Sequence, residues 1–287
     1  MKESDILNKK VLFLVITFVI AFFLIQYPTS FASPPGPRVE ISSRRGFDSC
    51  AMPNYNQMVQ IGNNSDFWSL GIYIGGSNAL CTYNDPLFVN ASSGYGWGFL
   101  PLFVGRQAPC TSYASKTDYD LPTSASYGSG DGTYAENRAI YLGFTRGSVI
   151  YLDVEGFDPA DSSCRNAMKA YVQGFVKQLH NDGWKTGVYG SSCSSYASDW
   201  ITISPPPDQV FLAEYYNAPV SVANTNVFNR SCVNNLNWGN NQRHHQYFTT
   251  QLSKKYGSYT LPNRDETCSQ GWVAGNGYND GVLNTCP

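Results

Sequence analysis

Charged residues are scarce in this sequence. They make up 14% of its 287 residues, and the formal net charge is −2. A nucleic-acid binder carries a basic excess to neutralise phosphates, so this balance argues against nucleic acid as a partner. Ala, Glu, Lys and Leu do not dominate, which excludes a coiled coil. The 15% of aromatic residues, which include 20 Tyr, exclude an intrinsically disordered chain.

Long hydrophobic runs are absent after the first 32 residues, which have the pattern of a secretory signal. Lys9 and Lys10 precede an apolar run over residues 11–25, and residues 30–32 form a small-x-small cleavage site. At 15 residues the run is shorter than the roughly 20 that a membrane-spanning helix needs. We expect cleavage after Ala32, secretion, and no stable membrane anchoring afterwards. An uncleaved anchor is the alternative.

Paired metal-binding cysteines are also lacking, because no Cys-x-x-Cys motif occurs and the spacings of 18 to 54 residues match no zinc pattern. An even number of cysteines in a secreted chain predicts disulfides instead. The cysteines are Cys50, Cys81, Cys110, Cys164, Cys193, Cys232, Cys268 and Cys286. We expect no metal and no cofactor.

Removal of 32 residues from 287 leaves 255, about the length of a single (β/α)8 barrel. Residues 33–45 are rich in Pro and Ser and are interpreted as a short leader, so the barrel domain is expected over residues 46–287. Short apolar segments alternate with helical stretches, which predicts a parallel sheet in an α/β fold. The expected strands are residues 46–48, 70–75, 98–104, 149–155, 186–189, 210–215 and 245–248, with residues 259–261 leading into a weak eighth.

The clearest helix lies between the fourth and fifth strands, where apolar residues recur at helical spacing. They are Met168, Val172, Phe175, Val176 and Leu179. Residues 134–142 are a second helix candidate, and residues 110–132 and 224–242 are expected to be loops. These elements together predict a single TIM-like barrel stapled by disulfides.

The fourth strand ends in two acids. Side chains alternate along a strand, so Tyr151, Asp153 and Glu155 face the barrel interior when the apolar residues between them face the helices. The acids then emerge at the carboxyl end of the barrel, where barrel enzymes place their active sites. Neighbouring like charges raise one of the two pKa values, as a general acid requires. A salt-bridged structural site is the alternative.

Two more carboxylates end strands in the same way. Asp48 closes the first strand, and alternation with Val210 and Leu212 predicts that Glu214 points inward from the sixth. Glycosidic bond hydrolysis uses two carboxylates, although a Mg²⁺ or Ca²⁺ site would use the same oxygens. Aromatic residues at strand ends favour a sugar ligand. They are Tyr73, Tyr189, Tyr215, Tyr216 and Tyr247.

Segments spread in order from Gly46 to about Asp265 carry a family resemblance. They are residues 46–50, 71–76, 103–110, 150–155, 179–180, 187–192 and 243–247. They resemble the secreted bacterial glycoside-hydrolase-like TIM-barrel family of actinobacterial type, which is distantly similar to the Chalaropsis-type lysozymes. Those enzymes share an acid on strand one, an Asp-x-Glu on strand four and an acid on strand six. Asp48, the segment 153–155 and Glu214 match these places.

The resemblance implies roles for these acids. Glu155 would be the general acid, and Asp153 and Asp48 would orient the substrate or stabilise positive charge at the anomeric carbon. Glu214 would hold the substrate or polarise water. Asp265 is the candidate for the acid that ends the family's eighth strand, with Asp280 as its rival. The residues expected to bind substrate are Tyr73, Gln107, Tyr189, Tyr215, Gln246 and Asp265.

Residues 266–287 are expected to form a C-terminal extension. Four of the cysteines fall where relatives often have them, and successive loops at a barrel mouth are neighbours. On this basis the expected disulfides are Cys50–Cys81, Cys110–Cys164, Cys193–Cys232 and Cys268–Cys286. His180 is expected at a helix end, and His245 is a candidate for the barrel lining.

The leading hypothesis is a secreted, monomeric glycoside hydrolase that acts on a cell-wall, peptidoglycan-like polysaccharide. The alternative is a non-catalytic extracellular barrel that binds glycan. A third hypothesis, a cell-surface structural or interaction protein, predicts no glycan affinity.

Overall fold

The computed structural model describes residues 39–274, apart from residues 43, 159, 195, 196, 219 and 240. The expected signal segment, Asp280 and Cys286 lie outside the described residues. Among the described residues, no helix is both long enough and apolar enough to cross a membrane.

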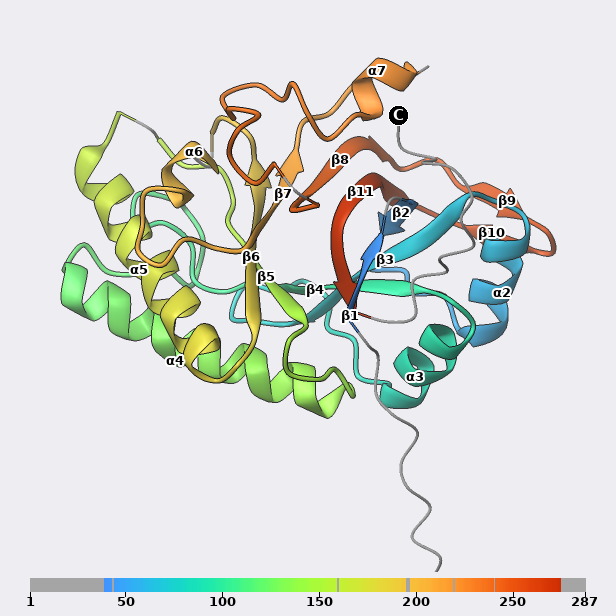
Figure 1. The fold of residues 1–287 in the computed structure, drawn as a ribbon, viewed down its shortest axis with the longest axis horizontal. Helices are drawn as coiled ribbons and strands as arrows, with labels where there is room; N and C mark the ends of the chain where they lie inside the picture. The colour runs from blue at the N-terminus through green and yellow to red at the C-terminus, as the bar shows by residue number, and fades with distance from the viewer. Residues whose placement is uncertain are drawn as a thin grey trace, which may run out of the picture. The chain divides into compact units, whose positions relative to one another are not determined.

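Eight strands close into a barrel, as the sequence predicts (Figure 1). Seven of them run parallel, in the order of the chain. They are β2 (Arg45–Asp48), β3 (Phe67–Gly75), β4 (Gly98–Phe103), β5 (Val149–Asp153), β6 (Lys185–Ser191), β7 (Gln209–Ala213) and β8 (Arg243–Thr250). All seven overlap the expected strands.

The eighth strand is β11 (Arg264–Ala274), and it corrects the sequence interpretation in two respects. It runs antiparallel to both β2 and β8, so the barrel is not wholly parallel. Residues 266–274, which were expected to lie in a C-terminal extension, belong to the barrel. Residues 259–261 instead form β10 (Tyr259–Leu261), which makes a hairpin with β9 (Lys254–Tyr256). The preceding strand β1 (Val39–Ser42) pairs with residues 271–274 of β11.

Polar side chains explain why β11 lacks an apolar strand pattern. Glu266 is buried, but its carboxylate accepts hydrogen bonds from Arg264 and Arg45. The hydroxyl of Tyr247 also donates to Glu266, at 3.0 Å. These contacts tie β11 to β2 and β8, so ion pairs replace apolar packing at the seam that closes the barrel.

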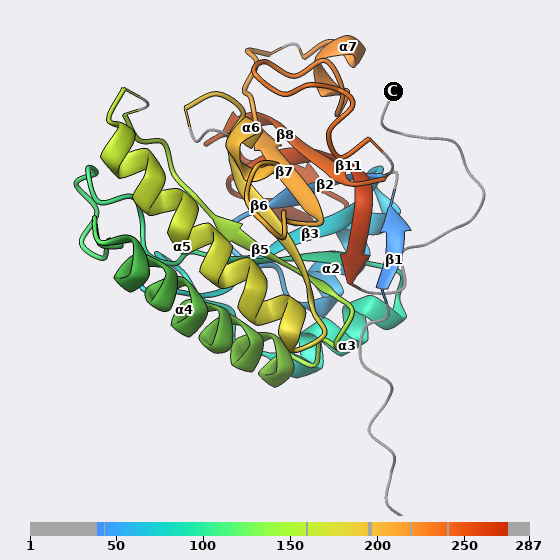
Figure 2. The same cartoon turned by 60° about the vertical axis from the view of Figure 1, so that its left-hand side comes forward.

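Two long helices, α4 (Leu121–Tyr141) and α5 (Ser162–Asn181), lie side by side outside β4 to β6 (Figures 1 and 2). The other helices are α2 (Tyr55–Asn63), α3 (Pro86–Gly94), α6 (Ala197–Trp200) and α7 (Val222–Thr225). The apolar face predicted for α5 is buried.

α4 begins inside a stretch that was predicted to be a loop. The side chain of Asp120 accepts a hydrogen bond from the backbone N–H of Thr123 and caps the helix, with Pro122 in its first turn. Gly128 and Gly132, two of the glycines that suggested a loop, are packing residues. A Cβ on Gly128 would lie 2.0 Å from the carbonyl oxygen of Tyr171, so only glycine lets α4 approach α5 this closely.

Alternation along β5 sorts its side chains as predicted. Ile150 and Leu152 join the main apolar core, which packs against the helices, and Val154 follows them just past the strand. Tyr151 packs inside the barrel with Leu100, Leu102, Val149 and Phe211. The two sides of the strand therefore have separate cores, and Asp153 continues the interior row.

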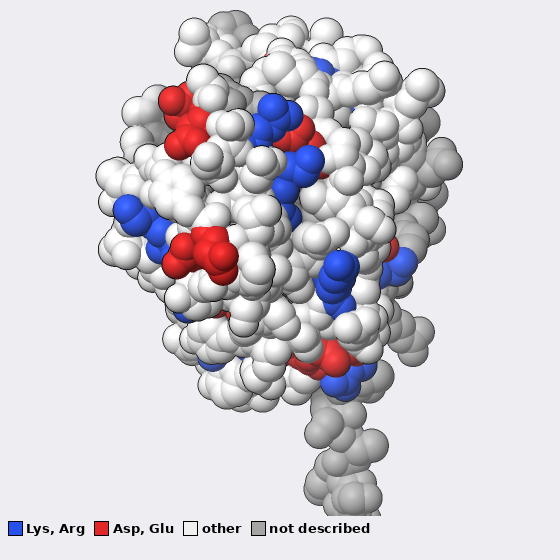
Figure 3. Space-filling view, turned by 90° about the vertical axis from the view of Figure 1, so that its left-hand side faces the viewer, with Lys and Arg blue, Asp and Glu red and all other residues white. Residues whose placement is uncertain are grey.

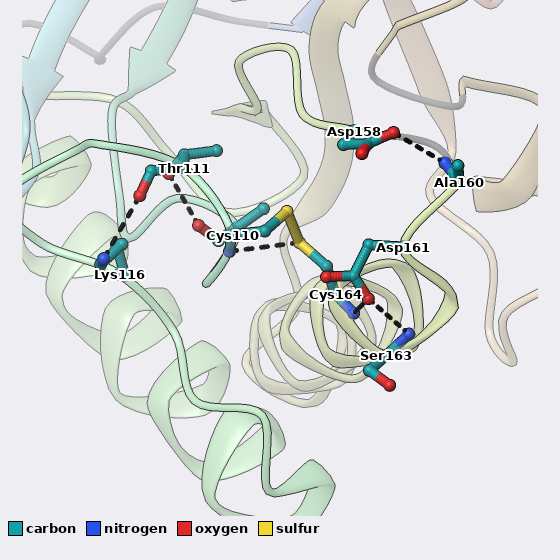
Figure 4. The surroundings of a disulfide bond; sticks show 9 residues. Cys110, Thr111, Lys116, Asp158, Ala160, Asp161, Ser163 and Cys164 are labelled. Atoms are coloured by element: carbon teal, nitrogen blue, oxygen red, sulfur yellow. Dashed lines mark hydrogen bonds between the residues drawn. A yellow bond between two sulfur atoms is a disulfide. The ribbon is translucent and has the colours of Figure 1, made fainter.

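Three of the four expected disulfides are present: Cys50–Cys81, Cys110–Cys164 and Cys193–Cys232. Each joins segments that follow the carboxyl ends of successive strands, so all three brace one end of the barrel. Figure 4 shows Cys110–Cys164, which ties the loop after β4 to the first turn of α5 beside its capping residue Asp161. The fourth expected pairing involves Cys286 and lies outside the described residues.

Few charged groups interrupt the surface. On the face drawn in Figure 3, Lys, Arg, Asp and Glu are scattered between uncharged residues. The carboxylates at the mouth of the barrel differ from these scattered charges, because they lie close together.

Candidate active site

Asp48 ends β2 and lies at the centre of the site, with 1% of its surface exposed. Tyr73 donates a hydrogen bond to its Oδ1 at 3.0 Å, and Gln246 donates to its Oδ2 at 2.6 Å. Burial and the nearby charge of Asp265 raise the pKa of Asp48 to about 8, against the lowering effect of those two hydrogen bonds. Asp48 therefore keeps its proton to a higher pH than an isolated carboxyl group does.

Asp153 and Glu155 lie beside Asp48 at the end of β5. Burial raises the pKa of Asp153 well above its usual value, and the charges of Glu155 and Asp48 raise it further. Its Oδ1 is buried and has no hydrogen-bond partner among the described residues. Burial also raises the pKa of Glu155, which is half-buried and reaches the solvent. The structure thus brings together the Asp-x-Glu pair and the acid of strand one.

Gln107 holds the backbone of this pair in place. Its Nε2 donates to the carbonyl oxygen of Asp153 at 2.9 Å, and its Oε1 accepts from the backbone N–H of Glu155 at 2.9 Å. The side chain is fully buried, and substrate binding by Gln107 stays a prediction. Its position supports the acids from beneath.

Asp265 enters the same cluster from the antiparallel strand β11, where it is the register partner of Asp48. Burial raises its pKa, although a hydrogen bond with Thr249 lowers it. Among the described residues, none of the ion pairs includes Asp48, Asp153, Glu155 or Asp265. Four carboxyl groups therefore share one site without a cation, and they retain protons that separate carboxylates would lose.

Tyrosines surround this carboxyl cluster (Asp48, Asp153, Glu155 and Asp265). Gln246 Oε1 accepts hydrogen bonds from Tyr189 at 2.7 Å and from Tyr215 at 2.5 Å, while its amide nitrogen donates to Asp48. Tyr215 is 49% exposed, so its ring is available to a ligand. Gln246 and Tyr189 are hydrogen-bonded parts of the wall.

Glu214 lines the site, but not as an inward-facing residue of β7, which was the prediction. Val210 and Leu212 face the outer core, so alternation does not point Glu214 into the barrel. β7 ends at Ala213, and Glu214 lies past the strand, where it accepts hydrogen bonds from Tyr216 at 2.7 Å and from the Ser231 backbone N–H at 3.0 Å. Burial alone would raise the pKa of Glu214, but these bonds and the charge of Arg230 outweigh it and lower the pKa.

Two pockets meet at Glu155. The hydroxyl pocket has a volume of about 410 Å³, and its lining includes Glu155, Tyr189, Glu214, Tyr215 and Ser231. Ser191 at the end of β6 and the next three residues also line it: Ser192, Cys193 and Ser194. The loop pocket, about 570 Å³, lies beyond Glu155 and Asp153. Its lining includes Tyr73, Asn78, Leu80, Tyr113 and the disulfide Cys50–Cys81. Glu155 therefore lines both pockets, which together form the cleft.

The sequence interpretation missed the serines and Tyr113. The sequence signal that could have revealed these serines is the serine-rich run at residues 191–195, directly after a predicted strand. Tyr113 lies in a loop that no strand pattern places.

Two of the aromatic candidates lie elsewhere. Tyr247 packs outside the barrel, and its hydroxyl contacts Arg45 and Glu266. Tyr216 also lies outside, where it holds Glu214. His245 bonds to the carbonyl oxygens of Glu214 and Thr225, whereas His244 is the histidine inside the barrel, beside Tyr151. His180 lies at the end of α5 and contacts Asp208 at 2.7 Å, as expected.

A possible metal site among the described residues consists of Cys110, Asp161 and Cys164. Its two sulfur atoms are joined in a disulfide, and Asp161 caps α5, so these residues do not fit a metal ion. The carboxyl cluster offers the oxygen ligands that Ca²⁺ and Mg²⁺ prefer. The raised pKa values of its members oppose such binding, because a metal ion binds the ionised form.

With this geometry established, the chain can be compared with known proteins. Residues 62–267 match the Rv2525c-like, glycoside hydrolase-like domain family. The chain belongs to this family. The match extends from the end of α2 into β11 and confirms the resemblance seen in the sequence. Among curated proteins, none matches the chain at a significant level.

Solved structures share the fold of this glycoside hydrolase-like domain. The Mycobacterium tuberculosis Tat-secreted protein Rv2525c, in complex with HEPES, has a TM-score of 0.52 at 14% identity, over 79% of this chain and 96% of that chain. Its complex with L-tartrate has a TM-score of 0.50 at 14% identity, with the same coverage. An uncharacterized B. stearothermophilus protein has a TM-score of 0.51 at 14% identity, over 78% of this chain and 95% of that chain.

Proposed function

We propose that the protein hydrolyses a glycosidic bond in a cell-wall, peptidoglycan-like polysaccharide, with Glu155 as the proton donor. The observation that carries this proposal is that the pKa values of two acids lining one pocket are shifted in opposite directions. The pKa of Glu155 is raised and that of Glu214 is lowered. A protonated and an ionised carboxyl group on either side of a substrate are what glycoside hydrolysis requires.

Each acid then has one task. Glu155 gives its proton to the bridging oxygen as the bond from that oxygen to the anomeric carbon breaks. Positive charge develops at the anomeric carbon, and the ionised Glu214 stabilises it or removes a proton from the attacking water. Burial raises the pKa of Glu155, which favours the protonated form that a proton donor needs at the start of each cycle.

The surroundings agree with a glycan ligand. The hydroxyl pocket offers serine and tyrosine hydroxyls for sugar hydroxyl groups, and the exposed ring of Tyr215 suits stacking on a pyranose face. Three disulfides at the mouth fit a secreted protein, because such bonds persist in oxidising compartments. We propose a secreted monomer that acts on an extracellular polysaccharide.

The test is release of reducing ends from purified cell-wall sacculi by wild type and by Glu155→Gln. The matched control is Asp158→Asn, which changes an exposed acid in the same loop. We expect the control to retain activity and Glu155→Gln to lose it. Equal activity of wild type and Glu155→Gln would contradict the assignment.

The second candidate function is glycan binding without cleavage. The observation in its favour is that the hydroxyl pocket can bind a sugar without any proton transfer. Wild type that binds sacculi, releases no reducing ends and keeps its affinity after Glu155→Gln would establish this function instead.

A further inference from the structure

A short segment of the loop before β8, residues 229–232, holds the carboxylate of Glu214. Ser231 donates to it twice, with its backbone N–H to Oε2 at 3.0 Å and with its hydroxyl to Oε1 at 3.0 Å. Ser231 is itself exposed, so its position depends on the residues beside it. One of them is Cys232, which follows it directly.

The backbone of this segment has a conformation that most residues seldom adopt. Asn229 has a φ of 58° and Cys232 a φ of 61°, both in the left-handed region. Asn tolerates this region, and Asn235 Oδ1 accepts a hydrogen bond from the backbone N–H of Asn229 at 2.8 Å. Cys232 is the third residue of a turn that is closed by a 3.4 Å bond from the Val233 N–H to the Arg230 carbonyl oxygen. A positive φ at that position favours glycine, so a cysteine there needs a restraint from the surrounding structure.

The disulfide with Cys193 supplies that restraint, at a Cα–Cα distance of 5.2 Å from Cys232. Cys193 follows β6 and lines the hydroxyl pocket, as do Glu214 and Ser231. The bond therefore ties the residue that holds Glu214 to the β6 side of the same pocket. Without the bond, Cys232 can leave the left-handed conformation and carry the backbone N–H of Ser231 away from the carboxylate.

This disulfide differs from Cys110–Cys164 in its access to solvent. Cys232 is exposed and Cys193 is half-buried, so a thiol in solution can reach the bond between them. Cys164 is fully buried, and the Cys110–Cys164 bond lines neither pocket. Cys193–Cys232 is therefore both open to thiol exchange and connected to an acid of the proposed mechanism.

We propose that the Cys193–Cys232 disulfide is a redox switch for Glu214, whose carboxylate is set for catalysis only when this bond is closed. The inference rests on the proposed function, because it concerns an acid assigned to that reaction. In the dithiol form Cys232 relaxes and the two hydrogen bonds from Ser231 are lost. A chain made in a reducing compartment is therefore incomplete at its hydroxyl pocket until it reaches an oxidising one.

Closure of the switch needs an oxidant, and a small-molecule disulfide such as glutathione disulfide supplies it by thiol–disulfide exchange. One cysteine thiolate attacks a sulfur atom of the oxidant and displaces a first thiolate. The other cysteine thiolate attacks the resulting mixed disulfide and displaces a second. The protein loses two electrons and two protons, and the oxidant becomes two thiols. A dithiol reductant reverses both steps.

Release of the segment 229–232 also changes the ionisation of Glu214. Burial raises the pKa of Glu214, and a hydrogen bond from Tyr216 lowers it. Hydrogen bonds from Ser231 and the charge of Arg230 lower it further, and both residues belong to this segment. Release should therefore raise the pKa of Glu214. The other titratable groups around Glu214, all outside the segment, are Glu155, Tyr189, Tyr215 and His245.

The test is an NMR titration of the full chain with 13C-labelled glutamate carboxyl groups, in which Glu214→Gln identifies the resonance of Glu214. We expect Cys193→Ser/Cys232→Ser to raise the pKa of Glu214. The matched control is Cys110→Ser/Cys164→Ser, which opens a disulfide of comparable span, 54 residues against 39, and should leave that pKa unchanged. An unchanged pKa in the first variant, or an equal rise in both, would overturn the proposal.

A second measurement leaves both cysteines of the switch in place. Dithiothreitol is added to Cys50→Ser/Cys81→Ser, which lacks a second exposed disulfide, and free thiols are alkylated and mapped. We expect Cys232 to react before Cys164, and release of reducing ends to fall at least tenfold and to recover with glutathione disulfide. Reaction of Cys232 and Cys164 at the same rate, or a release rate that survives reduction of the switch, contradicts the proposal. Absence of reducing ends even from the oxidised protein contradicts the proposed function instead, and the titration still decides whether the switch exists.

Discussion

Buried acids in this barrel are treated in two different ways. Along the closing seam, Glu266 is paired with Arg45 at 2.7 Å and with Arg264 at 2.6 Å. At the mouth, the carboxyl cluster has no ion pair among the described residues, and burial raises the pKa of each member. Acids of the first kind hold strands together, whereas acids of the second kind retain protons at a cost in stability. The contrast separates structural from chemical carboxylates.

The sharpest test of the contrast is Glu155→Gln. A positioned general acid contributes typically 10²- to 10⁴-fold, so we expect kcat to fall by about 10³-fold while binding of sacculi persists. Thermal unfolding should occur at the same temperature or higher, because one of the mutually repelling acids is gone. Marked destabilisation would place Glu155 with the structural acids.

The opposite result is expected for Glu266→Gln. Removing one partner of a buried ion pair is strongly destabilising, so we expect the free energy of unfolding to fall by about 3 kcal/mol. Urea titration measures this change. Asp66→Asn is the comparison, because it removes a more exposed partner of Arg45 and should cost under about 1 kcal/mol. Similar losses for the two variants would break the distinction.

The pH dependence of stability provides a third test. The folded-state pKa of Asp48 is about 8, above its unfolded value, so its stabilising protonation is complete below about pH 4 and is lost as the pH rises through 8. The other three acids shift in the same direction. The contribution of Asp48 to the free energy of unfolding should therefore fall from pH 4 to 8, by up to about 1.4 kcal/mol per pH unit. Buried His244 and His245, whose pKa values are lowered to about 3 and about 4, act in the opposite direction below about pH 6.5. The difference between the wild-type and Asp48→Asn profiles isolates this contribution, and a difference that does not fall over this range contradicts the raised pKa of Asp48.

Glu214→Gln should have the smallest effect on stability. Glu214 is an acid at the mouth whose charge is compensated by hydrogen bonds from Ser231 and Tyr216. A glutamine still accepts such bonds, so we expect a stability change under about 1 kcal/mol. Loss of the charge should lower kcat about tenfold or more. Unchanged kcat would remove Glu214 from the proposed chemistry.

The sequence predicted the parts of the fold that follow a regular pattern. The β5 segment, with apolar residues facing outward and acids facing inward, revealed both the barrel and Asp153 with Glu155. The α5 pattern was equally clear because its buried residues recur at helical spacing. Three disulfides followed from the proximity of successive loops.

The failures occur where partners distant in sequence decide the structure. β11 has no apolar pattern because Arg45 and Arg264 neutralise Glu266. α4 contains Gly128 and Gly132 because α5 packs against it closely. Glu214 was assigned to the interior by alternation, but a strand pattern ceases to apply once β7 ends at Ala213. Such contacts exist only in the folded chain.

The reversed direction of β11 also affects the order in which the protein can be completed. β11 supplies Asp265 to the site and joins both β2 and β8, and its last residues pair with the early strand β1. A chain growing on a ribosome presents β1 and β2 first and β11 last. The earlier strands therefore wait with open edges until synthesis reaches β11. Closure of the barrel and assembly of the carboxyl cluster are then a single late event, so prematurely ended chains have neither.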